Sequence, residues 1–375
     1  MSVPYVKFAD KKDPEFYKEL RKRVNTYFKE KNISKYGNLN MVLKSAFMLA
    51  LYFVPFVLMM TGVVDTTWLS IGMWALMGFG IAGIGLSIMH DANHGSYSKN
   101  NFINQMMGYT LAFAGGYPTN WIIQHNVLHH TFTNIEHFDE DIEKKGVMRF
   151  TPNQPHKGLF KYQIFYAPIL YMILTLYWVL SKDFEQIVRY NKMELLEGQQ
   201  LKLKNALSKI FLLKIVYIAT FIVLPIMLTD LHWSVPVLGF LLMHAIAGLV
   251  LALIFQSAHV IEETSFYEAD ENNSVEENWA ILQMHTTANF SNGSRLFSWY
   301  IGGLNYQIEH HLFPTICHVH YRSLSKIVKA TAKEYNVPYF HHKTFLGALK
   351  SHFTLLNDLG TGKYDKKQAS LKKVA

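Results

Sequence analysis

Long apolar blocks separated by polar and charged stretches dominate the pattern of this chain. Residues 42–62 and 66–88 form one pair of blocks joined by a short turn, and residues 209–229 and 233–256 form a second pair. Each block is long enough to cross a bilayer of roughly 30 Å at about 1.5 Å per residue. The pattern therefore predicts an all-α integral membrane protein with four transmembrane helices in two hairpins.

Two further apolar segments are weaker candidates for spanning. Residues 102–118 are rich in glycine and polar side chains, while 162–180 precede a basic stretch, 181–208. If 162–180 crossed the bilayer, that basic stretch would be exported, against the retention of Lys and Arg on the cytoplasmic side. We therefore expect both segments to be interfacial. The polar segments 89–208 and 257–375 and both termini then share the cytoplasmic side as a helical domain.

Charge and cysteine content narrow the possible partners. The formal net charge is +8, but the Lys and Arg residues flank the apolar blocks without an interleaved aromatic pattern. This favours anionic lipid headgroups over nucleic acid as the partner. The only cysteine, Cys317, excludes an intramolecular disulfide and a multi-cysteine metal site, and we expect the polar part to face a reducing compartment.

The chain divides by composition into a cytoplasmic segment at 1–40, a membrane domain at 41–325 and a cytoplasmic tail at 326–375. Within the first segment, Phe16, Leu20 and Val24 recur at helical spacing opposite basic residues. Such a helix either lies on the membrane surface or packs on the polar domain, and the pattern does not separate these alternatives.

Three clusters stand out among the eighteen histidines. They are His90-Asp-Ala-Asn-His94, His125-Asn-Val-Leu-His129-His130 and Gln307-Ile-Glu-His310-His311. Residues four apart share a helix face, so each of the first two clusters can aim two imidazoles at one point. Adjacent histidines diverge by roughly 100° on a helix and could serve neighbouring ions. Seven imidazoles exceed one tetrahedral zinc site and predict a polynuclear metal site, although the spacing leaves the element open.

The three clusters, their order and their position after hydrophobic hairpins resemble the histidine boxes of membrane fatty acid desaturases. The third region, Gly302 to Pro314, is similar to the subgroup in which glutamine replaces the first histidine, which includes front-end and related acyl-CoA desaturases. The resemblance extends through Trp279 to Asn289 and through His129 to Asn134, with Asp139 and Asp141, and covers roughly residues 40–325.

The resemblance implies a metal centre with two iron ions. The ligands that it implies are His90, His94, His125, His129, His130, His310 and His311. His259 resembles an additional histidine that completes the site, and Gln307 occupies a ligand position as a weaker donor that could act through water. Asp91 and Asn93 are candidates to hold the outer N–H of ligand imidazoles.

The activity implied is insertion of a cis double bond into the acyl chain of an acyl-CoA or membrane lipid, with O2 and two external electrons. A dinucleotide-binding glycine pattern, a cysteine cluster and a fused cytochrome b5 domain, which many front-end desaturases carry, are not found in the sequence. We expect electrons from NAD(P)H to arrive through a separate reductase and a ferredoxin or cytochrome b5.

Two questions stay open at this point. The cellular membrane is expected to be a bacterial inner membrane, with the endoplasmic reticulum as the alternative because Lys372 and Lys373 fit a dilysine retrieval signal. The same centre could instead hydroxylate, ketolate or epoxidise a lipid. A metal-binding transporter or receptor without redox chemistry is the third alternative, but it would need more polar residues within the spans.

Overall fold

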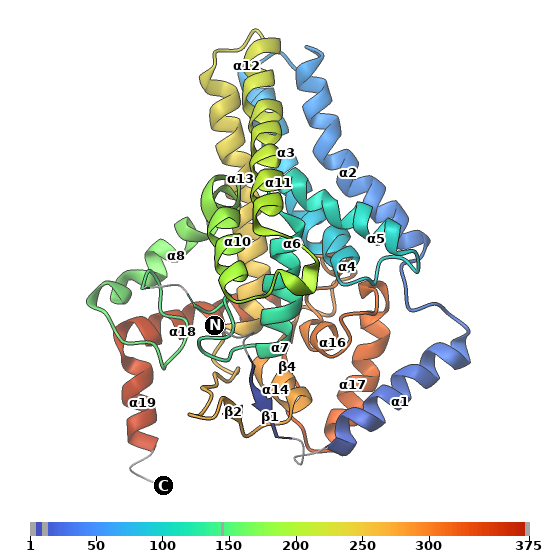
Figure 1. The fold of residues 1–375 in the computed structure, drawn as a ribbon, viewed down its shortest axis with the longest axis vertical. Coiled ribbons are helices and arrows are strands. Elements are labelled where there is room, and N and C mark those ends of the chain that lie inside the picture. The colour runs from blue at the N-terminus through green and yellow to red at the C-terminus, as the bar shows by residue number, and fades with distance from the viewer. Residues whose placement is uncertain (1–4, 10–13, 144–145, 372–375) are drawn as a thin grey trace.

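Helices make up most of the structure, because an apolar segment in a bilayer must satisfy its backbone hydrogen bonds internally. The computed structural model describes residues 5–9, 14–143 and 146–371, so that Lys372 and Lys373 lie outside the described residues. Figure 1 shows a bundle of long helices at the top, with a broader helical part below it that contains both ends of the described chain.

Four helical runs are long and apolar enough to cross a membrane. They are Leu39–Met60, Thr67–Asn93, Leu203–Leu228 and Ser234–His259. Their components are α2 (Leu39–Met60), α3 (Thr67–Gly83), the π-helix η1 (Ile84–Ile88), α4 (Met89–Asn93), α11 (Leu203–Ile218), the π-helix η7 (Ala219–Val223), α12 (Leu224–Leu228) and α13 (Ser234–His259). The expected all-α membrane fold with four spanning helices in two hairpins is confirmed.

Small residues let the spanning helices pack closely. A Cβ atom added at Gly78 of α3 would lie 2.7 Å from the carbonyl oxygen of Met243 in α13, and one at Gly80 would lie 2.9 Å from the backbone nitrogen of Tyr52 in α2. Close backbone approach through small residues is a main source of helix association in membranes, where lipid tails remove the hydrophobic driving force. α3 is thereby held between α2 and α13, which fixes the position of His90 and His94 after it.

The two weaker segments form broken helices. Residues 102–118 contain α5 (Asn101–Gly108) and the 3-10 helix η2 (Tyr109–Ala114). The second segment lies within the 3-10 helix η4 (Gly158–Tyr162), α8 (Gln163–Met172), α9 (Leu174–Tyr177), the π-helix η5 (Trp178–Lys182) and α10 (Asp183–Lys192). Its two halves, Gly158–Met172 and Leu174–Lys192, are bent by 57° relative to each other. Their interfacial placement stays a prediction.

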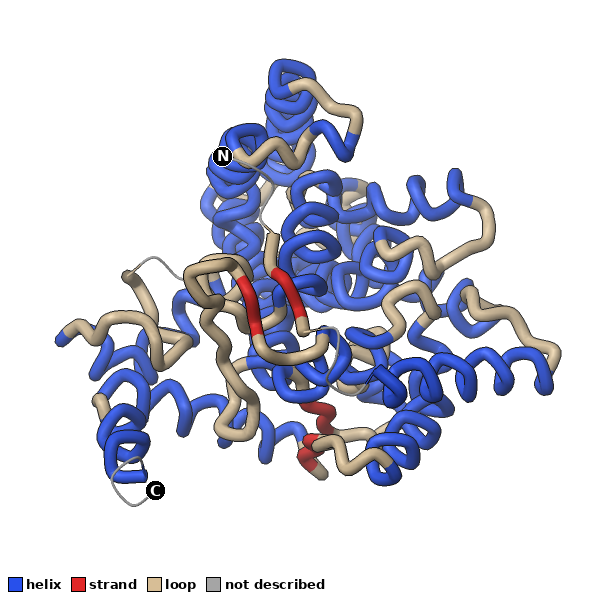
Figure 2. Tube along the Cα trace, turned by 60° about the horizontal axis from the view of Figure 1, so that its bottom comes forward, coloured by secondary structure: helices blue, strands red, loops and turns tan. Residues whose placement is uncertain are grey.

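The remaining elements build the polar part below the bundle. Its helices are α6 (Pro118–Trp121), the π-helix η3 (Ile122–His129), α7 (His130–Phe132), η6 (Glu197–Gln199), α14 (Trp279–Thr286), α15 (Arg295–Tyr300), α16 (Gln307–Leu312), η8 (His318–His320), α17 (Tyr321–Glu334), α18 (Phe345–Thr361) and α19 (Lys363–Leu371). Two short parallel pairs join β1 (Lys7–Phe8) to β2 (Ser274–Val275) and β3 (Ala288–Phe290) to β4 (Phe340–His342), as Figure 2 shows in red.

The first long helix, α1 (Pro14–Lys31), belongs to this polar part. Phe16, Leu20 and Val24 are buried, with exposed fractions of 0–1%, in one apolar cluster with Leu324 and Val328 of α17. The sequence left open whether this amphipathic helix lies on the membrane surface or packs on the polar domain. In the structure it packs on the polar domain.

Candidate metal centre

Eight histidines from distant parts of the chain meet beneath the membrane helices. His90 lies in α4 at the end of the second spanning run, and His259 is the last residue of α13. The other six are His94, which follows α4, His125 and His129 in η3, His130 in α7, and His310 and His311 in α16. The spanning helices therefore position the site from one side, and the short helices of the polar part close it from the other.

The first cluster consists of His90, His94, His125 and His310, whose ligand nitrogens all lie within 4.8 Å of one another. The Nε2 atoms of His90 and His125 are 3.2 Å apart. Facing Nε2 atoms at this distance require either a shared proton or a shared cation between them. The geometry of the first cluster is therefore that of a site for a positive ion.

The second cluster consists of His129, His259 and His311, whose ligand nitrogens also lie within 4.8 Å of one another. Nδ1 of His129 is 3.0 Å from Oδ2 of Asp139, and Nδ1 of His311 is 2.7 Å from Oε1 of Gln283. Nδ1 of His259 is 3.2 Å from the carbonyl oxygen of Thr286. Each contact pairs a ring N–H with an oxygen acceptor, which leaves Nε2 with its lone pair as the ligand atom.

His130 lies between the two clusters. Its Nε2 is 2.9 Å from Nε2 of His310, and its ring stacks on His311 with centroids 4.4 Å apart. His130, His310 and His311 also form a potential metal-binding group of their own. The two clusters have no residue in common, but this third group takes His310 from the first and His311 from the second, so the clusters are adjacent, as a two-metal centre requires.

The π-helical form of η3 explains why its histidines separate. In a π-helix the hydrogen bond runs from i to i+5, so residues five apart are aligned, unlike the α-helical spacing that the sequence suggested. His125 lies with its Nε2 atom 3.3 Å from that of His130, five residues on, in contact with the first cluster. His129, four residues on, groups with His259 and His311. The π-helix therefore directs His129 and His130 towards different groups, although His125 and His129 also form a potential metal-binding group with Asp141.

Burial keeps these imidazoles neutral. Desolvation first, and the neighbouring imidazoles second, lower the pKa of His125, His130, His310 and His311 well below the usual value of 6.5. The Nε2 atoms of His94, His259 and His311 are buried and make no hydrogen bond with the described residues. Buried neutral nitrogens without a hydrogen bond are costly unless a metal takes their lone pairs, so the residues present fit a nitrogen-rich pair of ions.

The other sequence candidates lie around the centre in different ways. Gln307, on α16, lies near His259, which places it beside the second cluster. Asp91 has Oδ1 3.9 Å from Nδ1 of His90 but Oδ2 2.8 Å from Nδ1 of His318. The Asn93 side chain donates to the Met89 sulfur at 3.6 Å, away from any hydrogen bond with a ligand imidazole among the described residues.

Several residues that hold the imidazoles carried no separate signal in the sequence. Asp139 and Gln283 lie within the segments that resemble the desaturase family. Their contacts to ring nitrogens, however, form only when separate segments of the chain fold together. Tyr321 places its hydroxyl 3.2 Å from Nδ1 of His310, and Trp279 donates from Nε1 to the carbonyl oxygen of His130 at 3.1 Å. A search for carboxylates and amides near the histidine clusters could have found the first two and not the others.

Comparison with known proteins yields one family and several curated relatives. The model of the fatty acid desaturase family matches residues 66–343. The chain is 34% identical over 347 residues to the sn-1 linoleoyl-lipid 6-desaturase of Arthrospira platensis, covering 92% of each protein. It is 33% identical to the sn-1 linoleoyl-lipid 6-desaturase of Synechocystis sp. (strain ATCC 27184 / PCC 6803 / Kazusa), covering 96% of this chain and 99% of that protein.

A plant relative is similar over less of its own length. The chain is 36% identical over 368 residues to the acyl-lipid (8-3)-desaturase of Physcomitrium patens, covering 95% of this chain and 74% of that protein. The family match includes all three histidine clusters and His259, which the structure brings together. This chain belongs to the fatty acid desaturase family, and it is an oxidoreductase of lipid metabolism in a membrane.

Proposed function

We propose that the protein inserts a cis double bond into the acyl chain of a membrane lipid, with two iron ions held by the two histidine clusters. The observation that carries the proposal is the convergence of eight imidazoles into two adjacent groups, which a third group of His130, His310 and His311 links. The proposed ligands are His90, His94, His125 and His310 for one ion and His129, His259 and His311 for the other, with His130 between them. Gln307 is proposed to act beside the second ion, directly or through water.

The reaction must balance two hydrogens, two electrons and one dioxygen. We propose that –CH2–CH2– and O2 are converted, with two electrons and two protons, to –CH=CH– and two water molecules. Bound iron would supply with O2 the strong oxidant that an unactivated methylene requires and that amino-acid side chains cannot provide. The chain's own residues keep the ligand nitrogens neutral, orient the rings and bury the site from bulk water.

An acyl-lipid substrate is favoured over an acyl-CoA by the relatives, whose names specify a linoleoyl-lipid and an acyl-lipid. Apolar side chains lie beside the first cluster. The ring centroids of Trp121 and His125 are 4.4 Å apart, and Trp121 lies near Leu111 and Trp178, around a space of only about 10 Å³ that Gln124, Asp183 and Gln186 also line. We propose that this wall helps to hold one carbon pair next to the ions.

The setting of the reaction is also proposed. The histidine clusters lie in the part of the chain that charge topology assigns to the cytoplasmic side, and we propose the cytoplasmic face of a bacterial inner membrane. Electrons would come from NAD(P)H through a separate reductase and carrier. The division into residues 1–40, 41–325 and 326–375 remains a prediction, since α1 and α17 pack together across it.

Lipid analysis tests the proposed reaction. The protein is expressed with an electron carrier in a host that lacks polyunsaturated lipids but is supplied with linoleate, and mass spectrometry locates the double bonds. A new cis double bond, with about two irons per purified chain, supports the proposal. Unchanged fatty acids would contradict it, and hydroxy, keto or epoxy lipids would instead indicate the related oxygen-inserting chemistry.

A further inference from the structure

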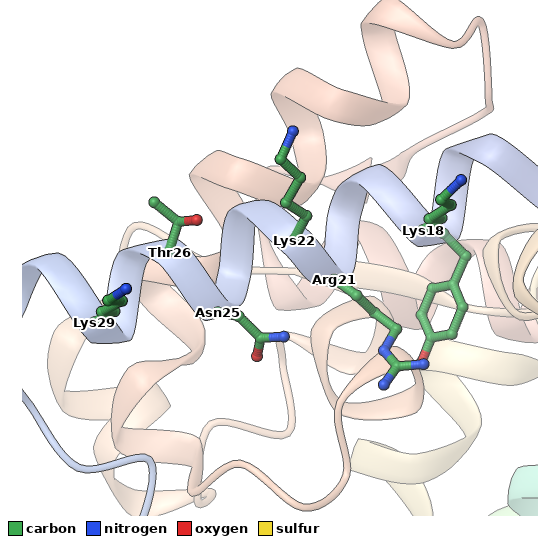
Figure 3. A pocket seen from close by; sticks show the side chains of 7 residues that line it. Lys18, Arg21, Lys22, Asn25, Thr26 and Lys29 are labelled. Carbon is green, nitrogen blue, oxygen red and sulfur yellow. The ribbon is translucent and has the colours of Figure 1, made fainter.

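A shallow, open surface along the outward face of α1, here called the basic groove, is lined by residues of this one helix alone. It has a volume of about 570 Å³, and its lining includes Lys18, Arg21, Lys22 and Lys29 (Figure 3). Lys18 and Lys22 form exposed ion pairs with Glu15 and Glu19 at 3.4 and 3.6 Å, which are too exposed to hold the lysines firmly. The face therefore carries a mobile positive charge that suits an acidic partner.

The position of α1 favours a protein partner over the lipid bilayer. A helix that binds a membrane surface buries its apolar face in the lipid. In α1 that face is occupied, because Phe16, Leu20 and Val24 pack in the polar part of the protein. Figure 1 places α1 in the lower part of the molecule, at the end away from the turn between α12 and α13. The basic groove is thus left for a soluble macromolecule.

One side chain of the groove reaches inward towards the metal centre. Tyr17 lines the groove, and its hydroxyl donates to the carbonyl oxygen of Leu312, the residue after His311, at 3.1 Å. Its ring meets that of Trp279 edge to face, with centroids 5.5 Å apart. Trp279 in turn donates from Nε1 to the carbonyl oxygen of His130 at 3.1 Å. Two aromatic side chains thus join the basic surface to the backbone of His130 and to that of Leu312, which follows His311.

We propose that the basic groove of α1 docks an acidic iron–sulfur electron carrier of the ferredoxin type, and that its electrons reach the metal centre through the Tyr17–Trp279 contact. This rests on the proposed function, because each double bond consumes two electrons. Two successive dockings oxidise two reduced carriers by one electron each. These two electrons, two protons and the two hydrogens removed from –CH2–CH2– together reduce one O2 to two water molecules. Neither Tyr17 nor Trp279 is consumed.

Charge and chain length support this choice of partner. Complementary charge steers a small acidic protein to a basic face and raises its association rate. Exposed basic residues continue on α17, which packs against α1, at Arg322, Lys326 and Lys329. The match along 92% and 99% of the two cyanobacterial relatives favours a bacterial setting for the carrier.

The docking test measures binding, independently of turnover. The iron-loaded full chain is placed in phosphatidylcholine nanodiscs, and its association with a purified plant-type [2Fe–2S] ferredoxin is followed by surface plasmon resonance at increasing salt. The double variant Arg21→Glu/Lys22→Glu should lower the association rate about tenfold and flatten its salt dependence, because like charges now face each other.

A matched control carries the same charge change elsewhere. Lys363→Glu/Lys366→Glu alters two exposed lysines of α19, which Figure 1 shows on the opposite side of the polar part from α1. This control should bind ferredoxin like the unmodified protein. Equal binding by the α1 variant and the control would overturn the proposal. So would a defect that appears only in nanodiscs containing phosphatidylglycerol, since α1 would then meet lipid headgroups, or binding of cytochrome b5 in place of ferredoxin.

The electron route has its own measurement. Trp279→Phe keeps a ring but removes the Nε1–H donor, and Tyr17→Phe removes only the hydroxyl. Both should bind ferredoxin normally while slowing its reoxidation in stopped-flow absorbance, Trp279→Phe more than Tyr17→Phe. Unchanged reoxidation in both variants would overturn the route.

A small-molecule electron donor distinguishes failure of the docking proposal from failure of the proposed function. Reduced methyl viologen carries no acidic surface, so it should support desaturation by the Arg21→Glu/Lys22→Glu variant as well as by the unmodified protein. If the unmodified protein forms no double bond with either donor, the proposed function fails. If viologen works and the α1 variant also keeps full activity with ferredoxin, the docking proposal alone fails.

Discussion

The two histidine clusters differ in how firmly the protein holds the outer nitrogen of each ring. In the second cluster, Asp139, Gln283 and the Thr286 carbonyl each accept from one Nδ1, at 2.7–3.2 Å. In the first cluster, His90 Nδ1 has no hydrogen bond among the described residues and lies 3.9 Å from Asp91.

The difference has a physical reason in what surrounds each cluster. Asp91 is already engaged, because Oδ2 accepts from His318 Nδ1 and from the His318 backbone N–H, and Lys44 contacts the other ring nitrogen of His318. Asp139 instead accepts from the backbone N–H groups of Asn134 and Asp141 while it faces His129. We infer that the second cluster is preorganised for its ion, whereas the first adjusts its rings when an ion binds.

Loss of a shared ligand should have the largest effect. His311 belongs to the second cluster and also to the group with His130 and His310, so His311→Ala should reduce bound iron from about two ions per chain to one or none and abolish desaturation. Iron analysis and lipid mass spectrometry check this. His341→Ala, an exposed histidine of β4, is the control and should keep both ions. Full iron content in His311→Ala would break the assignment of both clusters.

Acidification from pH 7.5 to 5.5 should lower the free energy of unfolding of the metal-free protein by on the order of several kcal/mol. The pKa values of His125 and His130, and those of His310 and His311, are lowered in the folded state, mainly by burial. Below the unfolded value of about 6.5 the unfolded chain takes up protons that the folded chain does not, so stability falls with pH.

Thermal unfolding of the metal-free protein at the two pH values measures this effect. Because both clusters consist of buried imidazoles, Ala substitution at His125 or at His311 should each reduce the pH dependence. A melting temperature that does not fall on acidification would show that the rings are already protonated in the folded state, and would undermine their role as ligands in both clusters.

Removal of the carboxylate behind His129 should weaken the second cluster selectively. Asp139→Asn should lower metal affinity about 10–100-fold, because the His129 N–H loses its anionic acceptor. Metal titration by competition with a chelator measures the loss. Glu143→Gln is the matched control in the same loop, since its carboxylate pairs with His137 at 2.8 Å and belongs to none of the potential metal-binding groups among the described residues. Equal losses in the two variants would contradict the comparison of the clusters.

The smallest loss of metal affinity is expected for Tyr321→Phe, which changes a neighbour of the first cluster. It removes a hydroxyl 3.2 Å from Nδ1 of His310, a contact worth about 1 kcal/mol, and so should weaken metal binding about fivefold. The same competition titration applies. A loss as large as that of Asp139→Asn would show that the first cluster is held as firmly as the second.

The sequence by itself determined the parts of this protein that depend on local pattern. Uninterrupted apolar length fixed the four spanning helices, because the bilayer demands it irrespective of tertiary contacts. The seven histidines of the three clusters were predicted as ligands by spacing and resemblance, and His259 by resemblance alone. The choice between membrane surface and polar domain for α1 stayed open, because an amphipathic stripe suits either.

Only the tertiary structure decided how these parts meet. The π-helix η3 brings His125 next to His130, five residues on, a contact that depends on backbone hydrogen bonding and that α-helical spacing did not anticipate. Asp139, Gln283 and Tyr321 hold the imidazoles only because segments as far as 28 residues apart fold against one another. The contact from Tyr17 to Trp279, across most of the chain, is likewise a product of packing. Sequence patterns encode periodicity and residue type, while contacts between distant segments depend on the whole fold.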